Sequence, residues 1–498
     1  MRKKDLIVIV PVAVVVLGLI GFLQEGSTPY AALLSSLNLL KVCLDPLPVN
    51  FFIEAARWLG IVFFFGLIYA AVVALIERGL VLAKASREDS VAVHGDSIYA
   101  EMLIKALGKS GIRSGSKLAF KASKQVIIFE KDSKAIEFYQ KHAAELSNAE
   151  EVHICLDLGS HVSIESHNVF VTNMSEIRAI DYWRKYYSTE QEKIVIVGSG
   201  RLPESVLYWA LLTNVFAVDC GNKYAVLGAF DKFIATHGDI ARTVSIYGND
   251  DIRFYKDAWY SDIELIKNAD RIILCDDTLD NVEMALDMRS LGINCPIHIF
   301  AENSSISVLA DKSMTIVGTL SKDNIKSVLL MDSIHEAGKM CHATYMILEK
   351  READAVTSGS ISDYLQDQEF IDSWKSLNSF TRGSNYATAI HDPLKKALLK
   401  EAGIDTAGLT AGENEELYNR LSGREKDRLQ EIEHIRWCRY HLLNNWKKPE
   451  GDIIIDGVKK AKDTKHRLHS DLVPYNELSQ DDKEKDAYFY KTLAVRDC

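Results

Sequence analysis

Two stretches of the chain have the residue types that bind a nucleotide, and the first is a glycine turn. Residues 193–200, KIVIVGSG, form an apolar run that ends in Gly198, Ser199 and Gly200. Gly198 permits a tight turn and Gly200 lets the backbone approach a pyrophosphate, while the following helix offers N-terminal amides and a partial positive charge. Asp219 follows at about 20 residues, where a carboxylate that binds ribose is expected. The pattern favours bound NAD or another nucleotide.

The glycine turn departs from the dinucleotide fingerprint at one position. Pro203 stands near the place where a third glycine would let the helix pack closely on the strand. A proline suits the first helical turn because its missing amide hydrogen would have no partner there. The substitution weakens the packing argument without removing the phosphate site. A structural turn that has lost its ligand is the alternative.

The second stretch lies near the C-terminus. Trp437 lies off the apolar stripe of a predicted helix, residues 425–446, and could stack on a base. Lys465, His466 and His469 could meet a phosphate. Taken singly, the tryptophan is also explained by packing, and the other three by a solvated surface. The region could equally be a protein-interaction or oligomerisation module.

The glycine turn must be positioned by the strands and helices around it. Strand and helix patterns alternate along the chain, which predicts parallel, doubly wound α/β structure. A helix is predicted at 203–214 and a long helix from Asn324. Strands are predicted at 91–97, 125–132, 151–157 and 168–173 in a first domain (90–190), and at 193–197, 215–219, 243–250, 271–277, 296–303 and 314–318 in a second (191–338). We expect two tandem Rossmann-like domains, and a single enlarged sheet is the alternative.

The first of these domains is predicted to be a shorter, degenerate copy of the second. It keeps Gly95 after its first strand, but its candidate acid, Glu130, is displaced by an insertion at residues 108–124. We therefore expect a role in packing or dimerisation.

The N-terminal 80 residues predict a membrane module. Residues 6–23 and 58–76 carry no charge, and each is close to the ~20 apolar residues that cross a bilayer as a helix. Basic residues flank both segments, and Lys41 is the one basic residue of the intervening loop. This pattern puts both termini in the cytoplasm of a multi-pass protein of the cell inner membrane.

The loop between the two segments predicts a short helix. Thr28 is a plausible N-cap and Pro29 suits the first helical position. The helix is too short to cross the bilayer. It could be a re-entrant pore helix, which is tolerated where protein or water surrounds it, or an amphipathic helix on the outer surface. Glu54 and Arg57 could face a pore mouth, or pair one helical turn apart.

The order of span, loop and span resembles the pore module of two-span potassium channels. In that resemblance Gly60 and Gly66 would flex the second helix as gating glycines. The filter differs, because NLLKVCLD (residues 38–45) stands where such channels present a run of carbonyls like TVGYG.

The segments KIVIVGSGRLPESV and ADRIILCDDTLDNVEMALDMRSLGINCPIHIFAEN resemble the RCK (TrkA-N) family of cytosolic gating domains, over roughly residues 90–340. The resemblance implies nucleotide-dependent gating and homo-oligomers, tetramers by family expectation. It also implies phosphate contacts from Gly198, Ser199, Gly200 and Arg201, a ribose contact from Asp219, and Asp276 near the ligand.

The segments EHIRWCRYHLLNNW and KHRLHSDLVPYNELSQDDKEKD resemble the RyR domain, the repeat named after ryanodine receptors, over a mostly helical region at 345–498. This resemblance implies a second, nucleotide-derived signal, in bacteria often in defence systems. Its candidate residues are Trp437, Lys465, His466, His469 and Tyr475.

Composition narrows the function. The net charge of −11 argues against nucleic acid as a partner, and the eight cysteines include no CxxC pair. Cys155 and Cys275 are expected to be buried hydrophobes. No recognisable catalytic motif is present. The order of span, loop and span, followed by two domains that resemble sensors, leads us to expect a nucleotide-sensing channel or pore effector. The alternatives are a membrane-tethered enzyme that consumes NAD, with Asp276 and Asp277 as acid or base, and a membrane-anchored scaffold.

Overall fold

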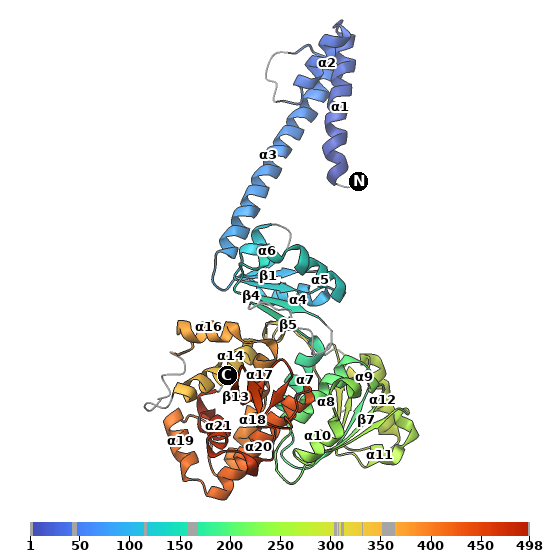
Figure 1. Ribbon diagram of the computed structural model, residues 1–498. Coiled ribbons are helices and arrows are strands. Elements are labelled where there is room, and N and C mark those ends of the chain that lie inside the picture. The colour runs from blue at the N-terminus through green and yellow to red at the C-terminus, as the bar shows by residue number, and fades with distance from the viewer. Residues whose placement is uncertain are drawn as a thin grey trace. The chain divides into compact units, whose positions relative to one another are not determined.

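The computed structural model describes residues 3–41, 47–113, 117–156, 168–302, 306, 308–309, 313–330, 332–350 and 364–496 (Figure 1). The chain divides into two compact units. An N-terminal unit comprises Met1–Arg87 with Ser116–Lys121, and a main unit comprises Glu88–Gly115 with Ala122–Cys498.

The N-terminal unit contains the helices α1 (Lys3–Gln24), α2 (Pro29–Asn38) and α3 (Phe51–Ala85). The loop helix begins as predicted. The Thr28 side chain caps α2 by accepting the amide hydrogen of Ala31 at 3.4 Å, and Pro29 is the first helical residue. Glu54 and Arg57 form an ion pair of 3.4 Å along α3, which is the simpler of the two roles considered for them.

The short helix α2 packs along α1, and Leu39, the residue that follows α2, lies against α3. A Cβ atom on Gly18 of α1 would lie 2.9 Å from the Ser36 hydroxyl, and a Cβ atom on Gly60 of α3 would overlap the Leu39 carbonyl oxygen. Ser36 and Leu39 are buried. Since Gly60 lies nine residues into α3, Leu39 meets that helix roughly 14 Å from its first residue, at 1.5 Å per residue.

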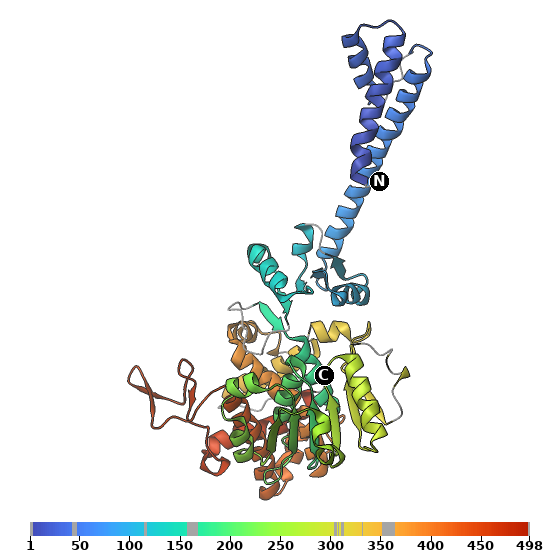
Figure 2. The same cartoon turned by 90° about the vertical axis from the view of Figure 1, so that its right-hand side faces the viewer.

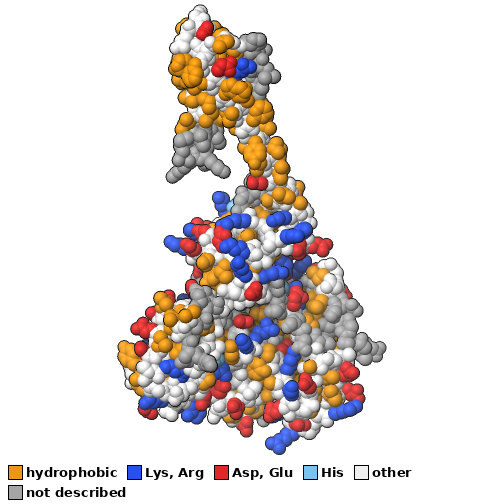
Figure 3. Space-filling view, turned by 180° about the vertical axis from the view of Figure 1, so that it is seen from behind, with side chains coloured by type: hydrophobic (Ala, Val, Ile, Leu, Met, Phe, Trp, Pro, Cys, Tyr) orange, Lys and Arg blue, Asp and Glu red, His pale blue; other side chains and the backbone are white. Residues whose placement is uncertain are grey.

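One described helix, α3, is long and apolar enough to cross a membrane by length and composition, with 6% of its apolar window buried. The other predicted span is represented by a shorter apolar helix, Ile9–Gln24. Figure 3 shows hydrophobic side chains over the surface of the N-terminal unit. Trp58, Val62 and Tyr69 of α3 are each at least 64% exposed, which is unusual for a surface that faces water.

The first sheet of the main unit is parallel and has the strand order β2-β1-β3-β4-β5. This is the flavodoxin-like order. The prediction of two separate Rossmann-like sheets, the first of them shorter, is confirmed, but the first sheet does not copy the strand order of the second. The extra strand, β2, lies inside the expected insertion. The strands are β1 (Val91–His94), β2 (Gly111–Arg113), β3 (Lys124–Ile127), β4 (Glu151–Cys155) and β5 (Val169–Thr172), and the helices α4 (Ile98–Leu107), α5 (Asp132–Lys141), α6 (Ala143–Leu146) and α7 (Met174–Lys185) accompany them.

The second sheet is parallel and has the strand order β11-β10-β9-β6-β7-β8. Counted from β6, this is the Rossmann order, whose switch point lies between β6 and β9. The strands are β6 (Lys193–Val197), β7 (Lys223–Leu227), β8 (Asp251–Tyr255), β9 (Arg271–Leu274), β10 (Ile297–Phe300) and β11 (Met314–Val317).

Both faces of the second sheet are covered, which explains its continuous apolar strands. Ile194 and Ile196 face a core formed with α7, α8 (Arg201–Thr213) and α10 (Ile240–Ile246). Val195 and Val197 face the opposite core, formed with α11 (Ile263–Lys267) and α12 (Thr278–Ser290). The central strands are therefore rigid supports for the loops at their carboxyl ends.

Two predicted strands were wrong. Residues 215–219 form no strand, because Val215 and Phe216 pack against the C-terminal helices. Residues 243–246 form the end of α10 and residues 247–250 a turn, and the N-cap of this helix, Asp239, accepts the amide hydrogen of Arg242 at 3.3 Å. The strands actually present, β7 and β8, begin after these segments.

The C-terminal region is mostly helical, as expected, and contains two small β-hairpins. Its hairpin strands are β12 (Ile453–Ile455), β13 (Val458–Lys460), β14 (Lys462–Asp463) and β15 (Leu468–His469), and its larger helices are α14 (Asp332–Lys350), α16 (Gln368–Ser376), α17 (Ser379–Ile390), α18 (Asp392–Glu401), α19 (Ala411–Arg420), α20 (Gly423–Leu443) and α21 (Gln480–Lys491).

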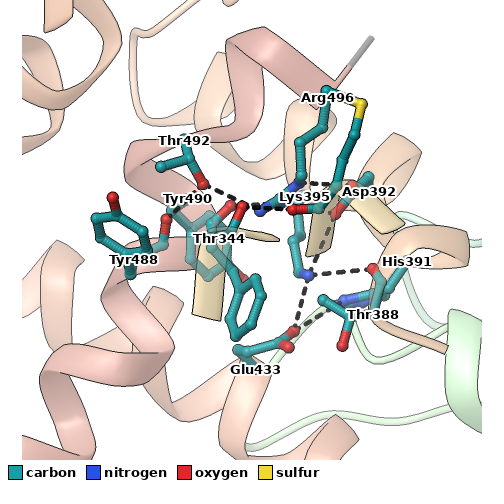
Figure 4. A network of polar contacts seen from close by, with 12 residues as sticks. Thr344, Thr388, His391, Asp392, Lys395, Glu433, Tyr488, Tyr490, Thr492 and Arg496 are labelled. Atoms are coloured by element: carbon teal, nitrogen blue, oxygen red, sulfur yellow. Dashed lines mark hydrogen bonds and ion pairs between the residues drawn. The ribbon is translucent and has the colours of Figure 1, made fainter. Parts of the chain in front are cut away.

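Buried charges hold this helical region together. The ammonium group of Lys395 lies 3.0 Å from Glu433 and 3.3 Å from Asp392, and Asp392 also accepts bonds from Arg496 (Figure 4). Lys395, Glu433 and Arg496 are at most 3% exposed. Each ionised group of the network has an opposite charge within reach, as burial requires.

Candidate functional site

The glycine turn lies at the switch point of the second sheet. It joins β6 to α8, directly beside the loop that joins β9 to α12. A Cβ atom on Gly198 would lie 3.0 Å from the backbone of Cys275, so only glycine fits this close approach. Gly200 has φ 98° and caps α8, and the space beside its Cα is open. The predicted turn therefore exists, in the position where doubly wound folds bind ligands.

Asp276 already occupies one amide of this turn. The Ser199 amide donates a hydrogen bond of 2.9 Å to the Asp276 carboxylate. Asn281 fixes the loop that carries the carboxylate, because its side-chain oxygen accepts the Asp276 amide hydrogen at 2.8 Å. A carboxylate at this amide competes with a phosphate for the same donor and repels it.

Arg201 is also engaged. Its guanidinium lies 2.8 Å from the Glu204 carboxylate, one turn along α8. On the other side of the turn, the Ser199 hydroxyl accepts the Ala229 amide hydrogen at 3.2 Å, and a Cβ atom on Gly228 would overlap the Gly198 carbonyl. The β7 side of the turn is therefore closed by backbone.

The structure separates Asp219 from the glycine turn. Lys193 pairs with Lys223 and Val197 pairs with Leu227 in the parallel register of β6 and β7. Asp219 precedes β7 and so lies at the amino edge of the sheet, whereas the turn lies at the carboxyl edge. The predicted ribose contact was wrong, because the prediction assumed a strand at 215–219.

A cavity of about 460 Å³ opens beside Asp276, at the carboxyl ends of β9 and β10. This volume suits a small ligand. The walls combine three carboxylates with one guanidinium and several apolar side chains, and the residues are Arg178, Asp276, Asp277, Thr278, Leu279, Phe300, Glu302, Ile306, Val308 and Leu309.

Arg178 reaches this cavity from α7. Its guanidinium donates to the carbonyl oxygens of Gly318 at 2.8 Å and Ala301 at 3.1 Å, and lies 5.5 Å from the centre of the Phe300 ring. Asp277 is the N-cap of α12 and accepts the Leu279 amide hydrogen at 3.3 Å. Both polar groups are thus held in place by the backbone around them.

Of the cavity residues, only Asp276 and Asp277 were predicted from the sequence, and the most informative of the others are Glu302, Phe300 and Arg178. Glu302 ends a run that was predicted as a strand, so the rule that ligands bind at the carboxyl ends of strands would have found it. Phe300 lies in the same run. Arg178 lies on a helix that precedes the sheet, and no local pattern marks it.

The predicted second site is only partly assembled. Trp437 and His469 meet edge to face at 4.8 Å, and His441 lies 4.0 Å from the Trp437 ring. Burial lowers the pKa of His441 to about 3, so this histidine is neutral at pH 7.

Of the other members of the second site, Tyr475 is connected to the tryptophan through the ring of His434, which lies 5.8 Å from Trp437 and 6.3 Å from Tyr475. Lys465 and His466 are exposed in the turn between β14 and β15, and His466 pairs with Asp463 at 2.6 Å. The Tyr475 hydroxyl donates to Gln430 at 2.7 Å. The structure therefore joins the aromatic pair and leaves the basic residues on the surface.

The first sheet shows a tight switch point between β1 and β3. A Cβ atom on Gly95 would overlap the Ile128 carbonyl oxygen. Asp96 accepts the Glu130 amide hydrogen at 3.2 Å and pairs with Lys134 at 2.8 Å. Glu130 therefore meets this loop through its backbone.

The two cysteines that end apolar runs, Cys155 and Cys275, are not reactive nucleophiles. Cys155 and Cys275 are buried, as expected, and burial raises the pKa of each thiol. Their neutral thiols pack as small apolar groups.

No family model matches the chain, and the comparisons find no similar curated protein and no similar solved structure. The resemblances to the RCK and RyR families therefore stay predictions.

Proposed function

We propose that the chain is a membrane-embedded sensor, a channel or pore effector, that binds a small nucleotide-type ligand at the carboxyl edge of its second sheet. The observation that carries the proposal is the cavity of about 460 Å³ beside the glycine turn at the Rossmann switch point. Its apolar wall, which includes Phe300 and Leu279, suits the face of a base. Its carboxylates suit ribose hydroxyls or an exocyclic amine.

The geometry favours a ligand with little negative charge next to the turn. Asp276 holds the Ser199 amide, and Glu204 holds Arg201. A pyrophosphate would have to displace both partners. A nucleoside or a mononucleotide whose phosphate points to solvent therefore fits better than NAD, which was the first expectation from the sequence.

The membrane part of the proposal rests on the packing of the N-terminal unit. If α3 crosses the bilayer, α1 lies at the same depth, because Gly21 of α1 is packed against Ile53 of α3. The two helices then form two spans of the inner membrane with both termini in the cytoplasm. The helix α2, packed beside Gly60, is then a re-entrant element, and a homo-oligomer, such as a tetramer, would line a pore with it.

Ligand binding is tested with the full chain in lipid nanodiscs, by thermal unfolding with adenosine, AMP and NAD. We expect adenosine or AMP to raise the unfolding midpoint, and the Glu302→Arg variant to abolish the shift. Glu264→Arg is the matched control, because Glu264 is a 77% exposed side chain on α11. A shift with NAD alone, or an equal shift in both variants, contradicts the proposed ligand class.

Gating is tested separately by current recordings from the full chain in planar bilayers. We expect the stabilising ligand to change the current in the wild type and not in Glu302→Arg. Ligand binding without any current would refute the channel and favour a scaffold. Product formation on incubation with NAD would favour the enzyme.

A further inference from the structure

An acidic face of α12 is left without partners in the main unit. Asp280, Glu283 and Asp287 are exposed at helical spacings of three and four residues, which places them on one face. Among the described residues none of these carboxylates has an ion-pair partner. Leu286 and Leu291, 47% and 46% exposed, lie beside them.

A basic arm, residues 447–470, has the opposite character. Its two hairpins stand away from the body of the main unit (Figure 2). Lys460, Lys462 and Lys465 are exposed and have no ion-pair partner within the described part of the chain. Ile454 and Val458 expose 58% and 52% of their surface on the same arm.

The net charge of the arm is opposite in sign to that of the rest of the chain. The arm has seven Lys and Arg and four Asp and Glu, a net charge of +3. The whole chain has −11, so the remainder has −14. Attraction between exposed charges of opposite sign guides association and fixes its register. The arm therefore fits an acidic protein surface that also offers apolar side chains.

We infer that the basic arm docks on the acidic face of α12 in a second copy of this chain. In both surfaces, two exposed apolar residues stand beside three unpaired charges, and the signs are opposite. Within one chain the arm and α12 lie on different sides of the main unit (Figures 1 and 2). The contact therefore joins neighbouring copies, either reciprocally in a two-fold dimer or head to tail in a ring or chain of subunits.

The contact is tested by zero-length carbodiimide coupling of the full chain in nanodiscs, with equal parts of ¹⁴N-labelled and ¹⁵N-labelled protein reconstituted together. We expect amide links between Lys460, Lys462 or Lys465 and the α12 carboxylates. Pairs of mixed isotope will show that they join two copies. High salt should reduce these links, because it screens exposed charges. Mixed-isotope pairs that never join the arm to α12 overturn the inference.

Charge reversal gives a second, independent test. The variant Lys460→Glu/Lys462→Glu/Lys465→Glu should associate at least tenfold more weakly than the wild type. Energy transfer between labelled copies, without any coupling reagent, measures this association. Mixing it with Asp280→Lys/Glu283→Lys/Asp287→Lys should restore the signal, since the charges are exchanged. These side chains are exposed, so both variants should fold.

Failure of the mixture to recover overturns the inference, and so does an arm variant that loses binding to anionic vesicles while keeping its association. The latter result would assign the arm to lipid headgroups. Neither result bears on the ligand cavity, which is tested through Glu302.

Discussion

At the scale of single residues, Glu176 is the clearest case of a group whose ionisation is set by its surroundings. Burial raises the pKa of Glu176 to about 7, and a hydrogen bond of 3.2 Å from the Trp209 indole partly opposes this rise. An unfolded glutamate has a pKa near ~4.3. The folded chain therefore retains a proton that the unfolded chain loses between about pH 4.3 and 7.

The Glu176→Gln variant is expected to remove a pH dependence. Because the folded carboxyl has the higher pKa, its contribution to stability is complete below about pH 4.3 and is lost as the pH rises toward 7. Glutamine stays neutral and can still accept the indole hydrogen. Denaturant unfolding measures the free energy of unfolding at pH 5 and pH 8. Between these two pH values this free energy should fall less in the variant than in the wild type. The exposed control Glu190→Gln should keep the wild-type difference between pH 5 and pH 8. If Glu176→Gln also kept that difference, the raised pKa of Glu176 would be contradicted.

At the scale of elements, glycines decide how closely the N-terminal helices approach. Gly60 allows the Leu39 carbonyl to lie against α3, while Gly66 on the same helix has no atom within 4 Å of its ideal Cβ position. The two glycines that resemble hinges are thus different, since the first is needed for packing and the second is not. Small residues at helix interfaces serve this purpose in membranes.

We expect Gly60→Leu to release α2 from the helical pair, because its side chain would occupy the place of the Leu39 carbonyl. Hydrogen exchange of the full chain in nanodiscs should show faster exchange of the α2 amides, by tenfold or more. Gly66→Leu is the matched control and should leave exchange unchanged. Equal protection in both variants would mean that α2 does not pack at Gly60.

At the scale of the whole molecule, one guanidinium joins the C-terminal helices to the second sheet within the main unit. Arg439 of α20 lies 2.7 Å from Asp250 and donates to the Leu211 carbonyl at 2.8 Å. Arg439 and Asp250 are at most 2% exposed. The Rossmann-like sheet and the helical region therefore share this buried ion pair, further hydrogen bonds such as that from Asn444 to the Tyr208 hydroxyl, and an apolar core that contains Ile390 and Leu443.

Arg439→Met should destabilise the main unit by about 3–5 kcal/mol, because it leaves the Asp250 carboxylate buried without its partner. The corresponding exposed pair, Arg253 with Asp251 at 3.1 Å, supplies the control, since Arg253→Met should leave the free energy of unfolding nearly unchanged. Urea unfolding of the full chain measures both. A similar small loss in the two variants would show that the buried pair does not hold the helices on the sheet.

Local patterns were enough for the glycine turn, the parallel sheets, the α2 cap and the long helix α20. Each depends on residues that are close in sequence, such as Thr28 with Ala31 or the apolar run before Gly198. The same patterns failed at residues 215–219, because an apolar run predicts burial but not the surface that buries it. Val215 and Phe216 pack under helices that lie far along the chain.

The sequence by itself determined the types of element, the apolar helix and the presence of a turn at a strand end. Only the tertiary structure decided the strand order, the contact of Asp276 with the Ser199 amide of the turn, and the cavity beside Arg178 and Glu302. The physical reason is that local propensity acts between neighbours in the chain. A cavity and its charge depend on segments that meet only when the sheet and its covering helices have assembled.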